Sequence, residues 1–327
     1  MATPIRWGIL GPGKIAHKFA QGLQTLPDAV IQAVASRDKA RSQEFAAEYG
    51  IINAYDSYEA LVADPEVDIV YVATPHTFHY DLTMMCIEAG KHVLCEKPMG
   101  INARQVQDMI CAAREKQVYL MEGLWTYFLP VWKRIREWLD AGLIGDVRLF
   151  QADFSFLGTD DLDSRLYNPG LAGGALLDIG IYPIVMSYWL FGRNPIEVAS
   201  LATLSSTGVD ASSAYLFKYD GGEMAVLNSS FQVHGPKEAV INGTKGRIRV
   251  PLFWKTEEAF LEIEDEVAEH FRAPHTATGL EYEAAAAMGD LRAGRLESEI
   301  FRQADSLRLV SMLDRLRADW GVIYPGE

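Results

Sequence analysis

The sequence predicts a two-domain protein of the α/β class, in which a doubly wound parallel sheet precedes an α+β domain built on a large, open antiparallel sheet. Three observations lead to this prediction. Short apolar strands alternate with amphipathic helices over the first third of the chain, as βαβ units require. Longer strands joined by glycine-containing turns follow beyond residue 123. The length of 327 residues exceeds the usual size of one hydrophobic core, so we expect domains at residues 1–123 and 124–327.

The strands expected in the first domain are short and mostly apolar, because helices cover both faces of a parallel sheet. They span residues 5–10, 30–35, 52–55, 68–74, 92–95 and 118–122. Helices are expected between them: from the turn after the first strand to about residue 26, at residues 39–49, 78–89 and 103–116, and in a short segment that begins at Ser57.

In the second domain, Pro130 and Gly142 bound a helix expected at residues 131–141, because proline favours the first turn of a helix and glycine its end. The turns at residues 220–222 (DGG) and 242–243 (NG) are typical of hairpins and predict an antiparallel sheet. The expected strands span residues 147–156, 197–205, 211–219, 223–233, 238–242, 247–250 and 260–263, and further helices span residues 174–190, 280–293 and 298–318.

The segment after the first strand, residues 11–16 (GPGKIA), has the G-x-G-x-x-A spacing of a dinucleotide-binding turn of the Rossmann type. Gly11 permits the tight turn, Gly13 leaves room for the pyrophosphate, and Ala16 lets the helix pack closely on the strand. Amide groups at the N-terminus of the helix favour phosphate. Because strand, turn, helix and second strand follow in the required order, we expect a nicotinamide dinucleotide here; a plain glycine turn is the alternative.

The end of the second strand distinguishes the two nicotinamide cofactors, because an acidic residue there binds the ribose 2′-hydroxyl of NAD. The sequence places Ser36, Arg37 and Asp38 at this end, and Arg41 one helical turn later. A hydroxyl and a guanidinium suit the 2′-phosphate of NADP. Asp38 keeps NAD open, unless its role is to cap the next helix. We therefore expect NADP, with NAD as the alternative.

The composition disfavours several classes of partner. The net charge of −14 disfavours nucleic acid and anionic membranes. No apolar stretch is expected to reach the roughly 20 residues of a membrane span. Three cysteines are too few for a disulfide framework, and the N-terminus leads directly into the first strand without room for a signal peptide. We expect a cytoplasmic protein.

Residues 89–99 (AGKHVLCEKPM) are the most informative segment for function. A short strand brings Glu96, Lys97 and Pro98 to its carboxyl end, which is where open α/β sheets bind ligands. A surface lysine before a turn proline is the alternative interpretation. The dinucleotide turn upstream and a second polar cluster downstream favour a catalytic lysine.

Three segments in order resemble the Gfo/Idh/MocA family, which takes its name from glucose–fructose oxidoreductase and inositol dehydrogenase. They are residues 11–16, residues 89–98 (AGKHVLCEKP) and residues 173–182 (GGALLDIGIY), and the resemblance covers nearly the whole chain. Residues 75–79 (PHTFH), 121–126 (MEGLWT) and 279–284 (GLEYEA) are most similar to the branch of dimeric dihydrodiol and D-xylose dehydrogenases.

The resemblance implies hydride transfer between NADP(H) and the CH–OH or C=O group of a pentose, a hexose or a cyclic trans-dihydrodiol. It also implies a cis peptide bond before Pro98 and a homodimer through the open face of the C-terminal sheet. An inositol or anhydro-sugar substrate and a non-catalytic, nucleotide-sensing regulator are the alternatives. Two positions depart from the family: Tyr127 replaces a frequent arginine and Ile181 a common cysteine.

The reaction needs proton transfer at the oxygen that is oxidised or reduced. We expect Lys97 to orient and polarise this oxygen and Tyr182 to exchange the proton, because a neighbouring ammonium lowers the pKa of a tyrosine. Asp178, four residues earlier on the same helical face, would orient Lys97 or a substrate hydroxyl. His79 is expected to relay a proton or contact the substrate. For Tyr182, Asp178 and His79, packing or capping is the alternative.

The remaining candidates follow from the same expectation. Aromatic walls suit the apolar face of a sugar or a flat dihydrodiol ring. No metal is expected, because a catalytic zinc needs about three protein ligands and His76 and His79 have no obvious third. The expected substrate-binding residues are Trp125, Phe154, Arg148 and Trp254; the expected cofactor-binding residues are Gly11, Gly13, Lys14, Ile15, Ser36, Arg37, Thr74, His76, Glu96 and Lys97.

Overall fold

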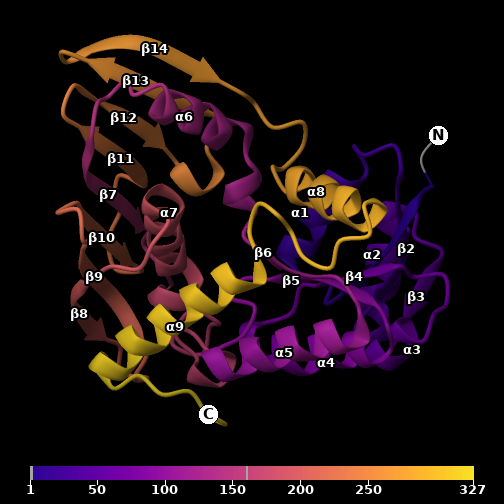
Figure 1. Cartoon of the computed structure of the whole chain (residues 1–327). Helices are drawn as coiled ribbons and strands as arrows, with labels where there is room; N and C mark the ends of the chain where they lie inside the picture. The colour runs from indigo at the N-terminus through magenta and orange to yellow at the C-terminus, as the bar shows by residue number, and fades with distance from the viewer. Residues whose placement is uncertain (1–2, 160) are drawn as a thin grey trace. The chain divides into compact units, whose positions relative to one another are not determined.

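The computed structural model describes residues 3–159 and 161–327. The described chain divides into two compact units, each drawn from two stretches of sequence (Figure 1). The first unit contains the residues up to Trp125 together with His275–Val310. The second unit contains Thr126–Pro274 and Ser311–Glu327.

The first unit is built on a six-stranded parallel sheet, as predicted. Its strand order is β3-β2-β1-β4-β5-β6, so the order reverses between β1 and β4. Helices cover it, with α4 packed beside α5 and α1 beside α8 (Figure 1). The strands are β1 (Ile5–Leu10), β2 (Ala29–Ala35), β3 (Asn53–Tyr55), β4 (Ile69–Val72), β5 (His92–Glu96) and β6 (Leu120–Gly123); the helices are α1 (Lys14–Leu23), α2 (Lys39–Tyr49), α3 (Tyr58–Val62), α4 (His79–Glu88), α5 (Ala103–Lys116) and α8 (Glu281–Arg292).

Helix α8 and its flanking segments belong to the first unit, although the sequence pattern grouped them with the second domain. The N–H of Leu120 donates to the carbonyl of Leu296 at 3.1 Å, and α8 packs on α1. The helical periodicity of residues 280–293 shows that one face is buried, but not which surface covers it.

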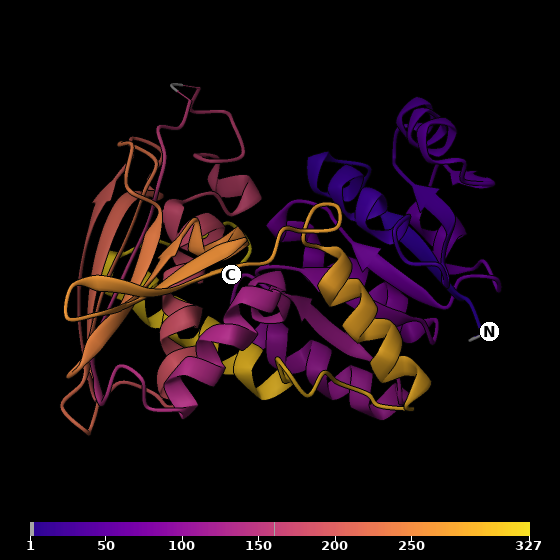
Figure 2. The same cartoon turned by 90° about the horizontal axis from the view of Figure 1, so that it is seen from above.

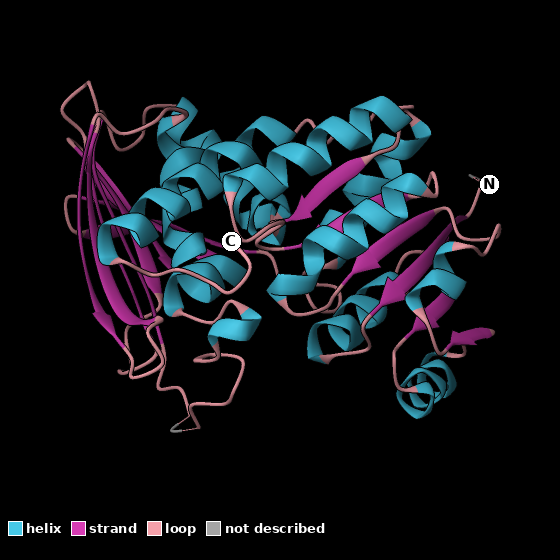
Figure 3. Cartoon of the chain, turned by 90° about the horizontal axis from the view of Figure 1, so that it is seen from below, coloured by secondary structure: helices cyan, strands magenta, loops and turns pink. Residues whose placement is uncertain are grey.

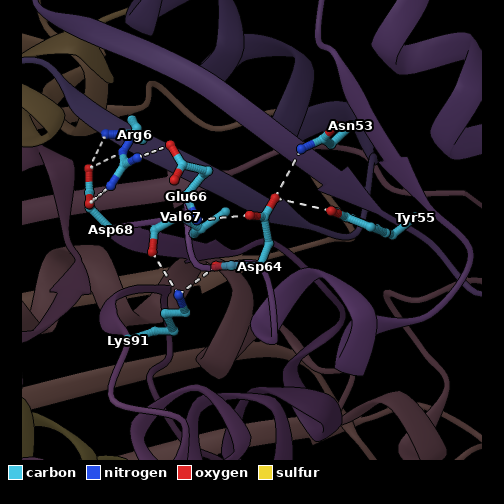
Figure 4. Close-up of polar contacts among 8 residues, drawn as sticks. All are labelled: Arg6, Asn53, Tyr55, Asp64, Glu66, Val67, Asp68 and Lys91. Atoms are coloured by element: carbon cyan, nitrogen blue, oxygen red, sulfur yellow. Dashed lines mark hydrogen bonds and ion pairs between the residues drawn. The ribbon is translucent and has the colours of Figure 1, made fainter.

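A polar network closes the edge of the parallel sheet at the amino ends of its strands (Figure 4). Arg6 donates to both carboxylate oxygens of Asp68, at 3.1 Å from Nε and 2.8 Å from Nη2. The ammonium of Lys91 donates to the carbonyls of Asp64 and Val67, at 2.6 and 2.9 Å. Lys91, although it lies in the segment that carries Lys97, therefore fastens the loop before β4 at the edge opposite to the one expected to bind ligands.

The second unit is built on an eight-stranded sheet in the order β14-β13-β12-β11-β7-β10-β9-β8. All neighbours are antiparallel except β7 and β10, which pair in parallel, so the sheet is mixed rather than purely antiparallel. The edge strand β14 was not expected, because its residues are largely polar and exposed. The strands are β7 (Val147–Ser155), β8 (Glu197–Leu204), β9 (Asp210–Lys218), β10 (Met224–Ser230), β11 (Glu238–Gly243), β12 (Gly246–Pro251), β13 (Glu258–Ile263) and β14 (Glu266–Arg272).

The helices of the second unit lie against one face of this sheet and leave the opposite face uncovered (Figure 2 and Figure 3). Helix α6 (Pro130–Asp140) packs on β13 and β14, and α7 (Ile181–Phe191) packs on β7 and β10. A π-helical turn at Leu176–Gly180 leads into α7, and α9 (Gln303–Trp320) ends in this unit.

One apolar segment corrects the expectation from sequence. Among the described residues, Pro169–Phe191 alone has the length and mean hydropathy of a membrane-spanning helix. No apolar stretch of this length was expected from the sequence. Of its most apolar 18-residue window, 89% is buried inside the protein, as in the core helix of a globular unit.

Candidate active site

The glycine turn after β1 has the geometry that a dinucleotide requires. Gly11 has φ of +88°, and a Cβ there would lie 2.9 Å from Thr74 Cγ2. At Gly13, by contrast, a Cβ would meet none of the described atoms within 4 Å. Helix α1 begins at the exposed Lys14 without a side-chain cap, so its first amides point into this open space. The turn therefore fits a pyrophosphate.

Thr74 adds a second observation in favour of a ligand at this edge. It follows β4, the strand beside β1, and touches the Gly11 turn at the point where the strand order reverses. Its hydroxyl is buried and has no hydrogen-bond partner among the described residues. A buried polar group without a partner is rare in proteins and suits contact with a ligand or water, so Gly11, Gly13 and Thr74 together fit a bound nucleotide.

At the end of β2, Asp38 caps helix α2. Its Oδ1 accepts the N–H of Ala40 at 3.0 Å. The hydroxyl of Ser36, which is 5% exposed, accepts the N–H of Asp38 at 3.2 Å. The Asp38 carboxylate therefore caps the start of α2, in agreement with the capping interpretation, and does not serve ribose recognition alone.

Two guanidinium groups flank the same strand end. Arg37 is exposed and lies over the ring of Phe78, with its Cζ 5.1 Å from the centroid. Arg41 is also exposed and donates to the carbonyl of Pro12 in the glycine turn at 3.4 Å. Arg41 thus contacts the glycine turn and Arg37 lies at the same end of β2, an arrangement that suits an additional phosphate.

Lys97 follows directly after β5, at the carboxyl edge of the parallel sheet, and is half-buried. The peptide bond between Lys97 and Pro98 is cis, which confirms the expectation from the resemblance. The carboxylate of Glu96 accepts the hydroxyl of Tyr71 and, at 3.2 Å, the main-chain N–H of Lys97. Glu96 therefore fixes the backbone from which the lysine extends.

His79 is fully buried and holds the same turn. Its Nδ1 lies 2.8 Å from the carbonyl of Pro98 and its Nε2 lies 2.8 Å from the carbonyl of Thr74. Burial lowers the pKa of this imidazole, and the neutral ring has one N–H to donate. His79 therefore links the end of β4 to the Lys97–Pro98 turn, while the half-buried His76 lies in the preceding turn with its ring centroid 5.8 Å away.

Two further buried carboxyls behind this turn were not expected from the sequence. Glu122, 3% exposed, accepts the N–H of Met99 at 2.8 Å, and burial raises its pKa to about 7. Glu283 on α8 is fully buried, and neither of its oxygens has a hydrogen-bond partner among the described residues. Burial and the neighbouring Glu96 raise the pKa of Glu283 well above its usual range. Both glutamates lie in segments that resemble the family, Glu122 in residues 121–126 and Glu283 in residues 279–284. The resemblance of these segments was the signal that could have indicated them.

Trp125 follows β6 and is held by the segment before α8. Gly279 has φ of +90°, and a Cβ there would lie 2.6 Å from Trp125 Cζ3. The ring of His275 lies beside the same glycine, with 6.4 Å between its centroid and that of the Trp125 ring. Trp125 is half-buried, so part of its ring remains available for contact.

In the second unit, the segment resembling the second catalytic motif forms the π-helical turn and the start of α7. Asp178 lies within the π-helical turn and is 8% exposed. Its carboxylate accepts a hydrogen bond from the guanidinium of Arg165 at 3.1 Å. Arg165 comes from the preceding loop, carries no motif, and was not among the expected site residues. Tyr182 is in the first turn of α7 and is 6% exposed.

Three of the expected residues gather in the second unit. The rings of Phe154 and Trp254 stack with 3.8 Å between centroids and 22° between planes. The ring of Tyr182 lies 5.7 Å from Phe154. Strand β7 supplies Phe154, and the 3₁₀ turn at Phe253–Lys255 supplies Trp254. This arrangement joins an aromatic wall to the tyrosine expected to exchange a proton.

Arg148 does not belong to this aromatic group. It lies six residues before Phe154 on β7, which is about 20 Å along a strand, and pairs with Asp146 at 2.9 Å. Tyr127, which departs from the family pattern, donates its hydroxyl to the carbonyl of Val185 at 3.0 Å and so supports α7. Among the described residues, no group of three or more His, Cys, Asp or Glu side chains could hold a metal ion.

Comparisons with known families agree with this geometry. Residues 5–124 match the family model described as an oxidoreductase family with an NAD-binding Rossmann fold, GFO_IDH_MocA. Residues 132–249 match the GFO/IDH/MocA C-terminal domain. Trans-1,2-dihydrobenzene-1,2-diol dehydrogenases are similar over their full length: that of Xenopus tropicalis is 39% identical over 99% of this chain and 100% of its own, and that of Homo sapiens is 36% identical over 99% of each.

Solved structures are similar over nearly the whole chain. KijD10, a 3-ketoreductase from Actinomadura kijaniata in complex with NADP and TDP-benzene, is 28% identical with a TM-score of 0.86, over 97% of this chain and 98% of its own. A levoglucosan dehydrogenase in complex with NADH and levoglucosan has a TM-score of 0.85 over 99% of this chain and 100% of its own. At 19% identity, the latter likeness concerns the fold alone.

Proposed function

This chain belongs to the Gfo/Idh/MocA family of NAD(P)-dependent oxidoreductases, and from that premise we propose that it transfers a hydride between NADP(H) and a sugar or a cyclic trans-dihydrodiol. The observation that carries the proposal is Lys97, held by Glu96 and His79 at the carboxyl edge of the sheet that also bears the Gly11–Gly13 turn. The dihydrodiol class comes from the curated relatives and the sugar class from the family resemblance.

The choice of NADP rests on the end of β2. Asp38 caps α2, whereas Arg37 is exposed at the end of β2 and Arg41 is exposed and contacts the glycine turn. Two guanidiniums recognise a 2′-phosphate better than they recognise a hydroxyl. The cofactor, when bound, supplies the nicotinamide that accepts or donates the hydride. Gly11, Gly13, Lys14 and Ile15 would hold its pyrophosphate, and Thr74, with a hydroxyl that lacks a partner among the described residues, would bind it as well.

Within the protein, Lys97 would donate a hydrogen bond to the substrate oxygen, and Tyr182 would take or return its proton. Asp178, oriented by Arg165, would bind a second hydroxyl of the substrate. Trp125 and the Phe154–Trp254 pair would contact the apolar faces of the ring. His79 would position the lysine, because its buried ring lies between the main-chain carbonyls of Pro98 and Thr74 and donates its one N–H to one of them.

We further propose a cytoplasmic homodimer, assembled through the uncovered face of the second sheet. The three cysteines are unpaired, as expected in a reducing compartment. Large apolar side chains lie exposed on β8, β9 and β10, with Val226 directly opposite Leu216. An apolar group of this kind on a sheet face is typical of a subunit interface. Its members are Leu201, Leu216, Met224 and Val226.

The experiment is a turnover assay that follows the absorbance of reduced nicotinamide. The panel contains NADP or NAD with D-xylose, D-glucose, an inositol and a cyclic trans-dihydrodiol. Turnover with NADP on a pentose, hexose or dihydrodiol is expected, and Lys97→Met should abolish it while cofactor binding persists. Preference for the inositol would move the substrate class to other polyols. Full turnover by the Lys97→Met variant would refute the role of the lysine.

A further inference from the structure

The segment that carries Asp178 and Tyr182 begins at a glycine turn held by a buried carboxylate. Gly174 has φ of +119°, and a Cβ there would lie 2.4 Å from Asp210 Oδ1. The other carboxylate oxygen of Asp210 accepts the N–H of Leu176 at 2.7 Å. Asp210 thus excludes any larger residue from the turn and fixes the first amide of the π-helical turn.

Asp210 comes from the start of β9 and is fully buried. Burial raises the pKa of its carboxyl to about 6, while the amide of Leu176, the hydroxyl of Ser213 and the guanidinium of Arg317 favour the anion. Such a buried carboxylate is costly unless its hydrogen bonds are made. The bond to Leu176 is therefore a strong constraint on this amide.

The C-terminal residues hold the same turn from another side. Tyr324, 1% exposed, donates its hydroxyl to the carbonyl of Gly173 at 2.7 Å. Its own N–H donates to the carboxylate of Glu327 at 2.9 Å, and Glu327 accepts two hydrogen bonds from Arg317 at 2.8 and 2.7 Å. Arg317 also lies over the Tyr324 ring, with 4.6 Å from Cζ to the centroid. The end of the chain is thereby folded back onto the glycine turn.

The far end of the π-helical turn is equally constrained. A Cβ at Gly180 would lie 2.6 Å from the hydroxyl of Tyr215 and 2.8 Å from that of Ser229. These hydroxyls bond to each other at 2.8 Å on neighbouring strands of the sheet. Both ends of the turn are therefore set by buried polar groups rather than by apolar packing alone.

The register of this turn matters for chemistry. A π-helical turn contains one residue more than an α-helical turn. Its conversion to a regular α-helix would therefore rotate the residues before it by about 100° relative to those after it, which is the rotation per residue of an α-helix. Asp178 lies inside the turn and Tyr182 lies beyond it. A change of register would therefore change the direction of one side chain relative to the other, and the proposed function assigns both to one substrate.

We propose that Asp210 and Tyr324 are positioning residues for the reaction, which hold the π-helical turn and thereby fix the directions of Asp178 and Tyr182 relative to each other. This inference rests on the proposed function, because that function assigns both side chains to the substrate. It gives the C-terminal residues, remote in sequence from every motif, a role in turnover rather than in folding alone.

The test compares Tyr324→Phe, which removes one hydroxyl, with Tyr219→Phe as a matched control. The hydroxyl of Tyr219 is also buried in the second unit, but it donates to Ser187, beyond the turn. Asp210→Ala removes the acceptor for Leu176, whereas Asp210→Asn retains an oxygen acceptor. Each full-length variant is measured for kcat, both KM values, thermal stability and hydrogen exchange of the amides at residues 174–182.

Tyr324→Phe and Asp210→Ala are expected to lower kcat by about tenfold to 100-fold and to accelerate exchange at residues 174–182, with the KM for the cofactor unchanged. Asp210→Asn should recover most of kcat, and Tyr219→Phe should stay within about twofold of the wild type at a similar loss of thermal stability. Unchanged exchange, or the same loss of kcat in Tyr219→Phe, would overturn the proposal. Absence of turnover in the wild type would instead refute the proposed function on which it rests.

Discussion

Replacement of Glu122 by Gln tests the electrostatics behind the Lys97 turn without removing a contact. Oε1 of Glu122 accepts the N–H of Met99 at 2.8 Å, and a glutamine keeps this acceptor. Its other oxygen is buried and has no partner among the described residues. Burial raises the pKa of the carboxyl from 4.5 to about 7, so the folded protein retains a proton that the unfolded chain releases.

The sign and size of the effect follow from linkage. Below pH 4.5 the carboxyl is protonated in both states and contributes nothing. As the pH rises from 4.5 to about 7, the unfolded chain ionises first, so the free energy of unfolding of the wild type falls by about 1.4 kcal/mol per pH unit. The total loss is about 3 kcal/mol, and it stays constant at higher pH. A glutamine titrates in neither state and avoids this loss.

The assay is urea unfolding followed by circular dichroism at pH 5, 6, 7 and 8. Glu122→Gln should gain stability relative to the wild type as the pH rises, with the difference levelling off above pH 7. Glu44→Gln, at an exposed position on α2, controls for the loss of one negative charge. A difference that stays flat across this pH range, or one equal to that of the control, would refute the assignment of a buried, protonated Glu122.

Three more outcomes are expected. Glu283→Gln should become more stable than the wild type above about pH 5. Glu281→Gln should be less stable than the wild type at neutral pH, and the difference should vanish as the pH falls below about 4. Urea unfolding measures both. Arg41→Ala should raise the KM for NADP about tenfold or more and leave the KM for NAD within about twofold of the wild type. An enzyme specific for NAD would not show this difference between the two KM values. Val226→Lys should convert a dimer to a monomer in sedimentation velocity, and an unchanged sedimentation coefficient would exclude this face as the interface.

The first unit was predictable because its signals are local. A parallel strand is short and apolar, and the residues after its carboxyl end lie at the ligand-binding edge, so Gly11 and Lys97 could be placed from position alone. The parallel pairing of β7 with β10 was not predictable, because alternation identifies the buried face of a strand and not its neighbour. The same limit applies to α8, where the sequence predicted the helix but not the surface that receives it, whereas the polar edge strand β14 was not predicted at all.

Candidate residues were predictable where a motif carried them and not where three-dimensional burial did. Phe154, Trp254 and Tyr182 lie together in the second unit, where each is at a strand end, in a turn or at a helix start. Arg148 was grouped with Phe154 because both are on one strand, yet it lies near the start of β7, whereas Phe154 lies near its end. Two residues on one strand therefore need not share a site, whereas residues at the same end of neighbouring strands or helices are better candidates for one.

Helix α8 shows most clearly why buried acids escape a sequence argument. Glu281 and Glu283 stand two residues apart in its first turn, where acidic residues are ordinarily attributed to the positive end of the helix dipole. Burial acts to raise the pKa of Glu281, but the N–H groups of Ala277, Thr278 and Gly279 outweigh it, and the pKa is lowered. Glu283, two residues on, faces Glu96 and has no donor among the described residues, so its pKa is raised. Two glutamates in one helical turn thus have pKa values displaced in opposite directions, and the packing of α8 decides which one is raised and which one is lowered.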